Sequence, residues 1–294
     1  MAHEQNFGSF PSIALNGDPI QVKRHWDRHD SPLFERMQHE QTALAIVNAY
    51  DDELAPAVYP ERSVPGVMIG TQRLSRMGSV KLPERLALVD RLHDLPIDGL
   101  LSEVATVDNY VEQTRERVRT LVDAGAIRGA TQAELDAPVR RMSRRSQSAS
   151  YFGLAPTHTD AQKRHFGWAQ NPDTGQQSPR LVDWEQLHLG PELADFAFMS
   201  MRHPHERRAI MSHLETHFAE QGTLRNELPA AMVFLEAHML IKGIYDRLIQ
   251  SHGTPKDHVL RMGGRAMLHS GLVWRNLGWR PETIDPRALA RLPS

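Results

Sequence analysis

One histidine and two aspartates in the middle of the chain have the types and spacing that catalysis requires. His158 and Asp160 flank Thr159 in a segment that we expect to be a loop, and Asp183 follows 23 residues after Asp160. A loop carboxylate such as Asp160 can orient a hydroxyl group and accept its proton as a new bond forms. Asp183 ends a short apolar run, which is typical of a buried strand, and its carboxylate oxygens are ligands that Mg²⁺ prefers.

Each of these signals is weak by itself, because such triplets and strand-end aspartates are common. Both aspartates could simply cap turns or helix ends. The order is more specific: an expected hairpin lies between Asp160 and Asp183, and Gly190, Pro191 and Asp195 follow. We therefore expect one shared site for the two aspartates, with His158 bracing the backbone of the loop.

Hydrophobic patterning predicts an α+β chain in two lobes. A small strand-rich lobe would cover residues 1–75 and a larger helical lobe residues 76–294. The small lobe would contain a hairpin within 1–25, a helix over 32–48 and a buried strand over 65–70. In the helical lobe we expect a loop over 155–165, strands near 165–169 and 179–183, and helices over 83–93, 105–124, 131–150, 191–200, 204–221, 226–251 and 256–277.

The order of these motifs resembles the aminoglycoside phosphotransferase and choline kinase-like family of small-molecule kinases, which have a protein-kinase-like fold. The resemblance implies that Asp160 is the base for the acceptor hydroxyl, with His158 in the same catalytic loop. It implies that Asp183 holds Mg²⁺ on the nucleotide and that Asp195 braces the catalytic loop.

The same resemblance implies nucleotide-binding residues in the small lobe. Lys23, at the end of a strand, would hold the nucleotide phosphates. Glu40, which lies 17 residues further on and inside a helix, would be its ion-pair partner, and Glu35 is the competing choice. A carboxylate partner is expected because it fixes the ammonium group in position beside the phosphates.

Two further segments would complete the nucleotide site. Residues 7–10, which include Gly8 and Ser9, would form the loop that covers the phosphates, and Gly8 would let the backbone approach the nucleotide. Residues 68–74, which include Met68 and Gly70, would meet the adenine through backbone groups.

One position departs from the family pattern. The family has an asparagine five residues after the loop aspartate, where it binds metal and hydrogen-bonds the catalytic carboxylate, and this chain has His165. Imidazole can ligate metals, but it suits zinc, copper or iron better than magnesium. It can also donate a hydrogen bond to Asp160. Turnover with altered metal geometry, nucleotide binding with little turnover, and a different reaction all stay open.

Composition argues against several other classes of protein. The 294 residues carry a formal net charge of −2, which provides no electrostatic basis for a nucleic-acid or membrane partner. The chain has no cysteine, which excludes disulfides, thiolate metal sites and cysteine nucleophiles. We see neither a leader segment nor an apolar run of 18 residues, so we expect a cytoplasmic protein.

The sequence thus predicts a small-molecule kinase that moves the γ-phosphate of ATP or GTP to a hydroxyl group, with Mg²⁺ as cofactor. By resemblance, an aminoglycoside-like or peptide antibiotic is a possible acceptor and antibiotic resistance a setting. Acidic residues of the later helices would favour a cationic acceptor if they faced the cleft: Glu215, Glu220, Glu227, Glu236 and Asp246. The alternatives are a nucleotide-binding partner or regulator with little turnover, and an unrelated helical binding protein.

Overall fold

The structure is a computed structural model that describes residues 7–13, 19–25, 32–123, 145–171 and 174–248. The chain divides into two compact units that interleave along the sequence. The mixed unit comprises His3–Val104 and Leu154–Met199, and the helical unit comprises Ala105–Gly153 and Ser200–Ser294 with the first two residues. The lobe boundary expected after residue 75 stays a prediction.

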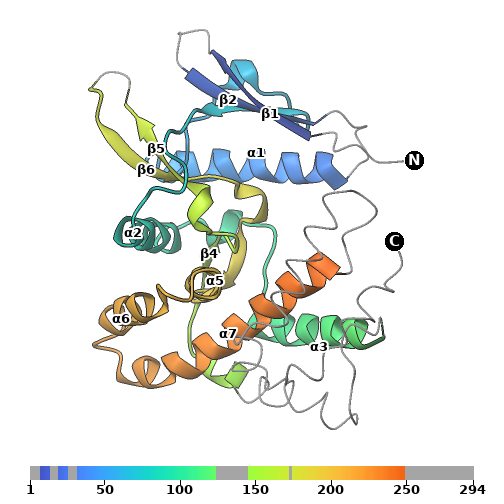
Figure 1. Ribbon diagram of the computed structural model, residues 1–294, viewed down its shortest axis with the longest axis vertical. Helices are drawn as coiled ribbons and strands as arrows, with labels where there is room; N and C mark the ends of the chain where they lie inside the picture. The colour runs from blue at the N-terminus through green and yellow to red at the C-terminus, as the bar shows by residue number, and fades with distance from the viewer. Residues whose placement is uncertain (1–6, 14–18, 26–31, 124–144, 172–173, 249–294) are drawn as a thin grey trace. The chain divides into compact units, whose positions relative to one another are not determined.

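A three-stranded antiparallel sheet with the order β1–β2–β3 opens the mixed unit (Figure 1). Its strands are β1 (Phe7–Ile13), β2 (Pro19–His25) and β3 (Met68–Gln72). The hairpin expected within 1–25 is confirmed, since β1 pairs with β2 along its whole length. The segment 7–10, which we expected as a loop, instead lies in β1, because its backbone is paired with the end of β2.

Side chains of the central strand alternate between the two faces of this sheet. Ile20 and Val22 are buried on one face, where Tyr59 and Met68 pack against them. Lys23 follows Val22, so its side chain leaves from the opposite face. The alternation therefore places Lys23 on the face opposite the buried pair Ile20 and Val22.

Helix α1 (Pro32–Tyr50) contains the expected helix 32–48 and packs against β2 and β3. Met37, Leu44 and Val47 are buried, and their spacing marks the inward face of the helix. Glu40 lies three residues after Met37, on the same face, and its side chain is 7% exposed. A buried carboxylate needs a charged or hydrogen-bonded partner, so this position already marks Glu40 as a residue with a specific contact.

Two short sheets complete the mixed unit beside helix α2 (Leu82–His93). The hairpin of β5 (Phe166–Gln170) and β6 (Gln177–Leu181) was expected from the sequence. The pair of β4 (Leu154–Thr157) and β7 (His188–Pro191) was not. Each of these two strands has four residues and contains a proline, and paired residues lie more than 30 positions apart in the sequence. No local sequence pattern therefore predicts their pairing.

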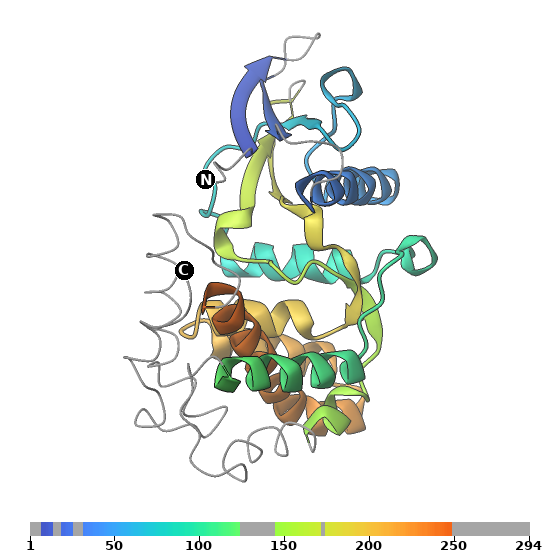
Figure 2. The ribbon, with the colours of Figure 1, turned by 90° about the vertical axis from the view of Figure 1, so that its right-hand side faces the viewer.

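The helical unit is built on α3 (Val107–Asp123), α6 (Arg207–His217) and α7 (Gly222–Leu248). Helix α3 lies beside α7 in both views (Figures 1 and 2). The rings of Tyr110 and His238 stack between them with centroids 4.1 Å apart.

The helices expected over 105–124, 204–221 and 226–251 are therefore present, and α7 begins four residues earlier than expected. Helix α5 (Ala194–Arg202) corresponds to the helix expected over 191–200. Most of the helix expected over 131–150, and all of that over 256–277, lies outside the described residues. Among the described helices, none has both the length and the apolar character that crossing a membrane requires.

Gly167 allows the segment after β3 to approach β5 closely. Ser75 and Trp168 exchange two backbone hydrogen bonds of 2.8 and 2.9 Å beside it. A Cβ atom at position 167 would lie 2.9 Å from the Cβ of Leu74 and would also collide with Met77 Sδ. Only a glycine therefore fits this crossing without a backbone shift.

We expect Gly167→Ala to lower the free energy of unfolding by about 1–3 kcal/mol, because the added methyl group overpacks a backbone crossing. Gly99→Ala is the matched control, since a Cβ there meets nothing within 4 Å. Urea unfolding of both variants measures the difference. Equal stability of the two variants would show that the crossing at Gly167 relaxes without cost.

Candidate active site

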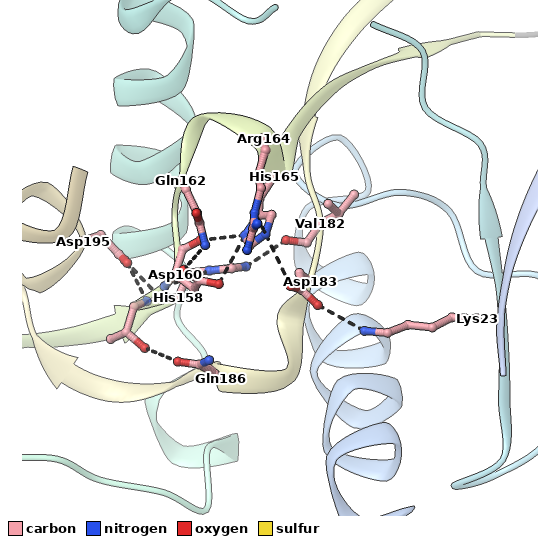
Figure 3. A network of polar contacts seen from close by, with 11 residues as sticks. Lys23, His158, Asp160, Gln162, Arg164, His165, Val182, Asp183, Gln186 and Asp195 are labelled. Atoms are coloured by element: carbon pink, nitrogen blue, oxygen red, sulfur yellow. Dashed lines mark hydrogen bonds and ion pairs between the residues drawn. The ribbon is translucent and has the colours of Figure 1, made fainter. Parts of the chain in front are cut away.

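The loop after β4 carries His158 and Asp160 and is fixed by a buried carboxylate (Figure 3). Asp195, in the first turn of α5, accepts hydrogen bonds from the backbone N–H groups of His158 at 3.0 Å and Thr159 at 2.6 Å. Thr159 has a φ of 50°, a left-handed conformation that is rare for a β-branched residue. The two hydrogen bonds that Asp195 accepts hold the loop in this strained conformation.

Asp195 is ionised although it is completely buried. Burial alone would raise the pKa of this carboxyl, but the hydrogen bond and charge of His93, together with His158, lower it below its ordinary value. The Nε2 atom of His93 lies 3.2 Å from Oδ2 of Asp195. The loop is thus tied to a carboxylate rather than to a neutral acid, and charged acceptors give the stronger hydrogen bonds.

His158 braces the loop, as expected, through both nitrogens of its ring. Nε2 donates to the backbone carbonyl of Val182 at 3.0 Å, and Nδ1 accepts from the backbone N–H of Asp160 at 3.3 Å. The side chain is buried, and its ring meets that of Trp184 edge to face with centroids 5.2 Å apart. This contact joins the Asp160 loop to the segment that carries Asp183.

Asp160 presents a partly exposed carboxylate that two neighbours orient. Nε2 of Gln162 donates to its Oδ1 at 2.5 Å, and Nδ1 of His165 lies 3.5 Å from its Oδ2. Gln162 is a site residue that the sequence reasoning missed. Its only signal was a polar residue two positions after Asp160, which by itself indicates nothing.

Asp183 and Glu40 both contact Lys23, which lies between them. Lys23 Nζ is 2.6 Å from Oε2 of Glu40 and 3.1 Å from Oδ1 of Asp183. The expected ion pair with Glu40 is therefore present, whereas Glu35 is exposed and borders a different cavity. In Figure 3 the side chains of Lys23 and Asp183 point toward each other.

The backbone presents Asp183 differently from the expectation of a strand end. Strand β6 stops at Leu181, and Val182 donates its N–H to the carbonyl of His165 at 2.9 Å. Asp183 itself has a φ of 72° and a ψ of 55°, a left-handed conformation that aspartate tolerates better than most residues. Its carboxylate is thereby directed to Lys23 on one side and to His165 on the other.

Charge interactions shift the pKa values of this cluster. Burial alone would lower the pKa of Lys23, but Glu40 and Asp183 raise it above the ordinary value, so the ammonium is charged at neutral pH. Burial would raise the pKa of Asp183, but Lys23 and then His165 lower it. Burial raises the pKa of Glu40, and the contact with Lys23 opposes that change.

His165 is buried between the two aspartates in a defined orientation. Nδ1 lies 2.7 Å from the backbone carbonyl of Asp160, and Nε2 lies 3.5 Å from Oδ2 of Asp183. Nε of Arg164, which can only donate, lies 3.1 Å from the same Nε2. Burial lowers the pKa of the imidazole below its ordinary value, although Asp160 and Asp183 oppose this, which favours the neutral ring.

A cavity of about 300 Å³ adjoins this cluster within the mixed unit. Its charged and imidazole-bearing walls come from Lys23, Glu40, Asp183 and His165. The other residues that line it are Gln21, Ile69, Thr71, Gln72, Leu74, Met77 and Val182. The arrangement is a mixed polar and apolar pocket with a lysine and two carboxylates at its wall.

The remaining residues assigned from the sequence to the nucleotide site lie elsewhere on the sheet. Strand alternation directs Ile69 and Thr71 into the cavity, whereas Met68 packs against Ile20 and Val22 on the opposite face. Gly70 faces that same side, because a Cβ there would lie 2.6 Å from the Cβ of Arg62.

The backbone N–H and carbonyl groups of Gly70 also have partners within the protein. Gly70 N–H donates to Ser63 Oγ at 3.1 Å, and the carbonyl of Gly70 accepts from Tyr59 N–H at 2.8 Å. Gly8 and Ser9 pair with Arg24 and Lys23 in the β1–β2 ladder.

Among the residues that the structure describes, two overlapping groups of side chains could hold a metal ion. Asp160, His165 and Asp183 each offer a ligand atom within 4.8 Å of the others, and so do Glu40, Asp183 and Glu185. The carboxylate of Asp183 belongs to both groups and fits Mg²⁺, which prefers oxygen ligands. The imidazole nitrogen of His165 fits Mg²⁺ poorly.

Replacing Asp195 with asparagine should destabilise the protein by roughly 2–3 kcal/mol at pH 7, because one amide oxygen replaces a charged acceptor of two backbone hydrogen bonds. The pKa of Asp195 is lower in the folded than in the unfolded protein, so its contribution is complete above about pH 4. The contribution is lost as the pH falls through the folded value, and urea unfolding at several pH values should show the gap to wild type narrowing.

Asp52→Asn is the control for this prediction, because it alters an exposed carboxylate and should change the unfolding free energy by less than about 0.5 kcal/mol. A gap for Asp195→Asn that stays constant from neutral to acidic pH would contradict an ionised Asp195.

Comparison with protein-family models and with curated proteins finds no match to the sequence. Solved structures do match the fold. A choline/ethanolamine kinase family protein from Mesorhizobium loti is 15% identical and gives a TM-score of 0.57, with 94% of this chain and 93% of that chain covered. Aminoglycoside 2'-phosphotransferase-IIIa in its GDP complex is 12% identical and gives a TM-score of 0.60, with 94% and 92% covered.

A third match is macrolide 2'-phosphotransferase MphH from Brachybacterium faecium, which is 15% identical with a TM-score of 0.55 and covers 92% of this chain and 91% of that chain. Each match covers nearly all of this chain and of the matched chain. At identities this low, such matches establish a shared fold alone. An unrelated helical protein, which the sequence left open, is thereby excluded. The chain has the protein-kinase-like α+β fold of the choline kinases and the aminoglycoside and macrolide phosphotransferases, as its motif order predicted.

Proposed function

We propose that this protein is a small-molecule kinase, which moves the γ-phosphate of ATP or GTP to a hydroxyl group of its acceptor. The observation that carries the proposal is the position of Lys23 between Glu40 and Asp183 at the wall of one cavity. A nucleoside triphosphate is bound by a fixed ammonium group beside a carboxylate that can hold a divalent cation. The fold shared with small-molecule kinases supports the same reading.

The charge of each residue in the cluster would set its role in binding or transfer. Lys23 would contact the phosphates, and Glu40 would hold Lys23 in place while it does so. Asp183 would hold the cation, Mg²⁺ in the family pattern, which neutralises phosphate charge when bound. Asp160 would orient the acceptor hydroxyl and take its proton, and the loop bracing by His158 and Asp195 would keep that carboxylate in position.

The base of the nucleotide would occupy the apolar part of the cavity. Ile69, Leu74 and Met77 line this part, and they belong to β3 and to the segment that follows it. This shifts the proposed base contacts from Met68 and Gly70 to their neighbours on the cavity side of the sheet. For Gly8 and Ser9 we retain the proposal of phosphate contacts from the β1–β2 hairpin.

The exposure of the acidic residues in the helical unit is relevant to the charge of the acceptor. Glu236 is 3% exposed, and its carboxylate accepts hydrogen bonds from Arg207 at 2.8 Å and Ser200 at 2.5 Å. Its charge is therefore paired within the helical unit. Glu215 and Glu220 are exposed and Glu227 is partly exposed, and such carboxylates would favour a cationic acceptor such as an aminoglycoside-like antibiotic.

A second candidate function is nucleotide binding with little turnover, as in a regulatory partner. His165 is the specific observation in its favour, because a nitrogen ligand beside Asp183 differs from the oxygen ligands that Mg²⁺ prefers. The two candidates share the nucleotide site and differ in whether phosphate is transferred.

Thermal unfolding with ATP or GTP and Mg²⁺ tests the nucleotide site that both candidates share. A ligand that binds only the folded protein stabilises it by about 2.7 kcal/mol at roughly a hundred times its Kd. Lys23→Met should abolish most of this shift, and Asp183→Asn should abolish its dependence on Mg²⁺. Asparagine suits the left-handed backbone at position 183, so that variant should fold.

Arg24→Met is the matched control for Lys23→Met. It removes a cation from the next position of β2, whose side chain lies on the other face of the sheet. The nucleotide shift should be unchanged in this variant. If neither nucleotide stabilises the wild-type protein, or if Arg24→Met and Lys23→Met lose the shift equally, the proposed nucleotide site is wrong.

Asp160→Asn separates the kinase from the regulatory candidate. The asparagine keeps an oxygen for Gln162 but cannot accept a proton, so phosphate transfer should fall by roughly 10²–10⁴-fold. The nucleotide-induced thermal shift should remain. Transfer can be followed with a panel of aminoglycosides, macrolides, choline and ethanolamine, or as nucleotide hydrolysis by water. A wild-type rate no higher than that of Asp160→Asn would favour the regulatory candidate.

A further inference from the structure

We propose that His165 makes the cation site of this chain selective for a divalent first-row transition-metal ion over Mg²⁺, with Nε2 of His165 and Oδ2 of Asp183 as the two protein ligands. This inference rests on the proposed function, because it concerns the cation that would accompany the nucleotide. It differs from that function in that it identifies the class of metal and the atom that selects it.

The hydrogen bonds of His165 fix which nitrogen has the lone pair. Nδ1 lies 2.7 Å from the backbone carbonyl of Asp160, which can only accept, so Nδ1 carries the hydrogen. Nε of Arg164, which can only donate, lies 3.1 Å from Nε2, so Nε2 offers the lone pair. The two contacts independently require the same tautomer. A ring N–H donated to a backbone carbonyl is also the usual arrangement behind a metal-ligating histidine.

The distance between the two ligand atoms fits a single metal ion. Nε2 of His165 and Oδ2 of Asp183 are 3.5 Å apart. Two ligands roughly 2.1 Å from one ion are separated by about 3.0 Å at a right angle and by about 3.4 Å at a tetrahedral angle. Only a small adjustment of the side chains is therefore needed for both atoms to bind the same ion.

The backbone holds these two side chains in register. The N–H of Val182 donates to the carbonyl of His165 at 2.9 Å, which ties the residue before Asp183 to His165 itself. His165 is 7% exposed, so packing restricts its ring. The other oxygen of Asp183 is bound by Lys23 at 3.1 Å, which leaves Oδ2 for the cation.

The chemistry of this ligand pair favours a transition metal. Mg²⁺ strongly prefers oxygen ligands, whereas imidazole nitrogen binds first-row transition metals, and the affinity rises along the series from Mn²⁺ to Cu²⁺. Mn²⁺ has the lowest affinity of that series, so a preference for Mn²⁺ over Mg²⁺ is the most demanding test. Arg164, whose side chain is exposed at the site, would exchange its contact with Nε2 for the solvent or the nucleotide phosphates.

Electron paramagnetic resonance of Mn²⁺ bound to the full chain with ADP tests the nitrogen ligand directly, without any activity assay. Pulsed measurements should detect a ¹⁴N nucleus coupled to the manganese. Growing the protein with ¹⁵N-labelled histidine should remove the ¹⁴N coupling, whereas a nitrogen of the adenine ring would be unaffected by the label. This comparison uses the native sequence, so it does not depend on a variant that folds.

Competition between the two metals tests the selectivity. The Mg²⁺ concentration that displaces half of the bound Mn²⁺ should fall by roughly tenfold or more in His165→Asn, because the variant loses a nitrogen ligand and gains an amide oxygen. His217→Asn is the matched control: the same substitution at an exposed histidine of the helical unit should leave the displacement unchanged. Thermal unfolding establishes that His165→Asn is folded.

The outcomes separate this inference from the proposed function. Nucleotide-dependent binding of Mn²⁺ without histidine ¹⁴N coupling, or with the same displacement in wild type and His165→Asn, would overturn the role of His165 and leave the kinase proposal intact. Failure of both Mn²⁺ and Mg²⁺ to bind with nucleotide would overturn both proposals. A coupling that is removed by the ¹⁵N label, together with the shift in His165→Asn, would establish a histidine-ligated cation.

Discussion

The charge of Lys23 is the constraint on which the rest of the site depends. Its ammonium group lies between the carboxylates of Glu40 and Asp183, which come from a helix and from a loop far along the chain. A largely buried cation is costly without paired charges, and the neighbouring carboxylates of Glu40 and Asp183 would repel each other without it. The three groups are therefore stable only together, and this requirement fixes α1 and the Asp183 segment to the central strand of the sheet.

Asp183 connects this charge cluster to the second half of the site. One of its oxygens faces Lys23 and the other faces His165, whose ring hydrogen-bonds the backbone of Asp160. Backbone conformation is what allows this division, since the left-handed φ of 72° directs the carboxylate away from the path of β6. The proposed base and the proposed cation ligand are thus positioned by one short chain of polar contacts.

Two strained backbone conformations of the mixed unit lie within this chain of contacts. Thr159 and Asp183 both have positive φ, and each is next to a residue whose backbone is held by a buried partner. Asp195 secures the first of these segments through two backbone N–H groups, and His158 joins it to the second. Rigid support of this kind is what a site requires when its catalytic power comes from position and charge rather than from covalent chemistry.

Periodicity and motif spacing, which are local properties of the chain, predicted the fold class and the order of most elements. The resemblance of the motifs to a kinase family added expectations for individual residues. It predicted the Lys23–Glu40 pair and the neighbouring positions of Asp160 and Asp183. The folded chain was needed to show that β4 pairs with β7 and that Gln162 orients Asp160. It also showed that Met68 and Gly70 face away from the cavity, whereas Ile69 and Thr71 face it. Pairing register and side-chain direction depend on contacts between segments distant in sequence, which no local pattern contains. The Gln162 contact and the tautomer of His165 involve near neighbours in the chain, but they depend on the folded geometry of the loop rather than on residue types alone.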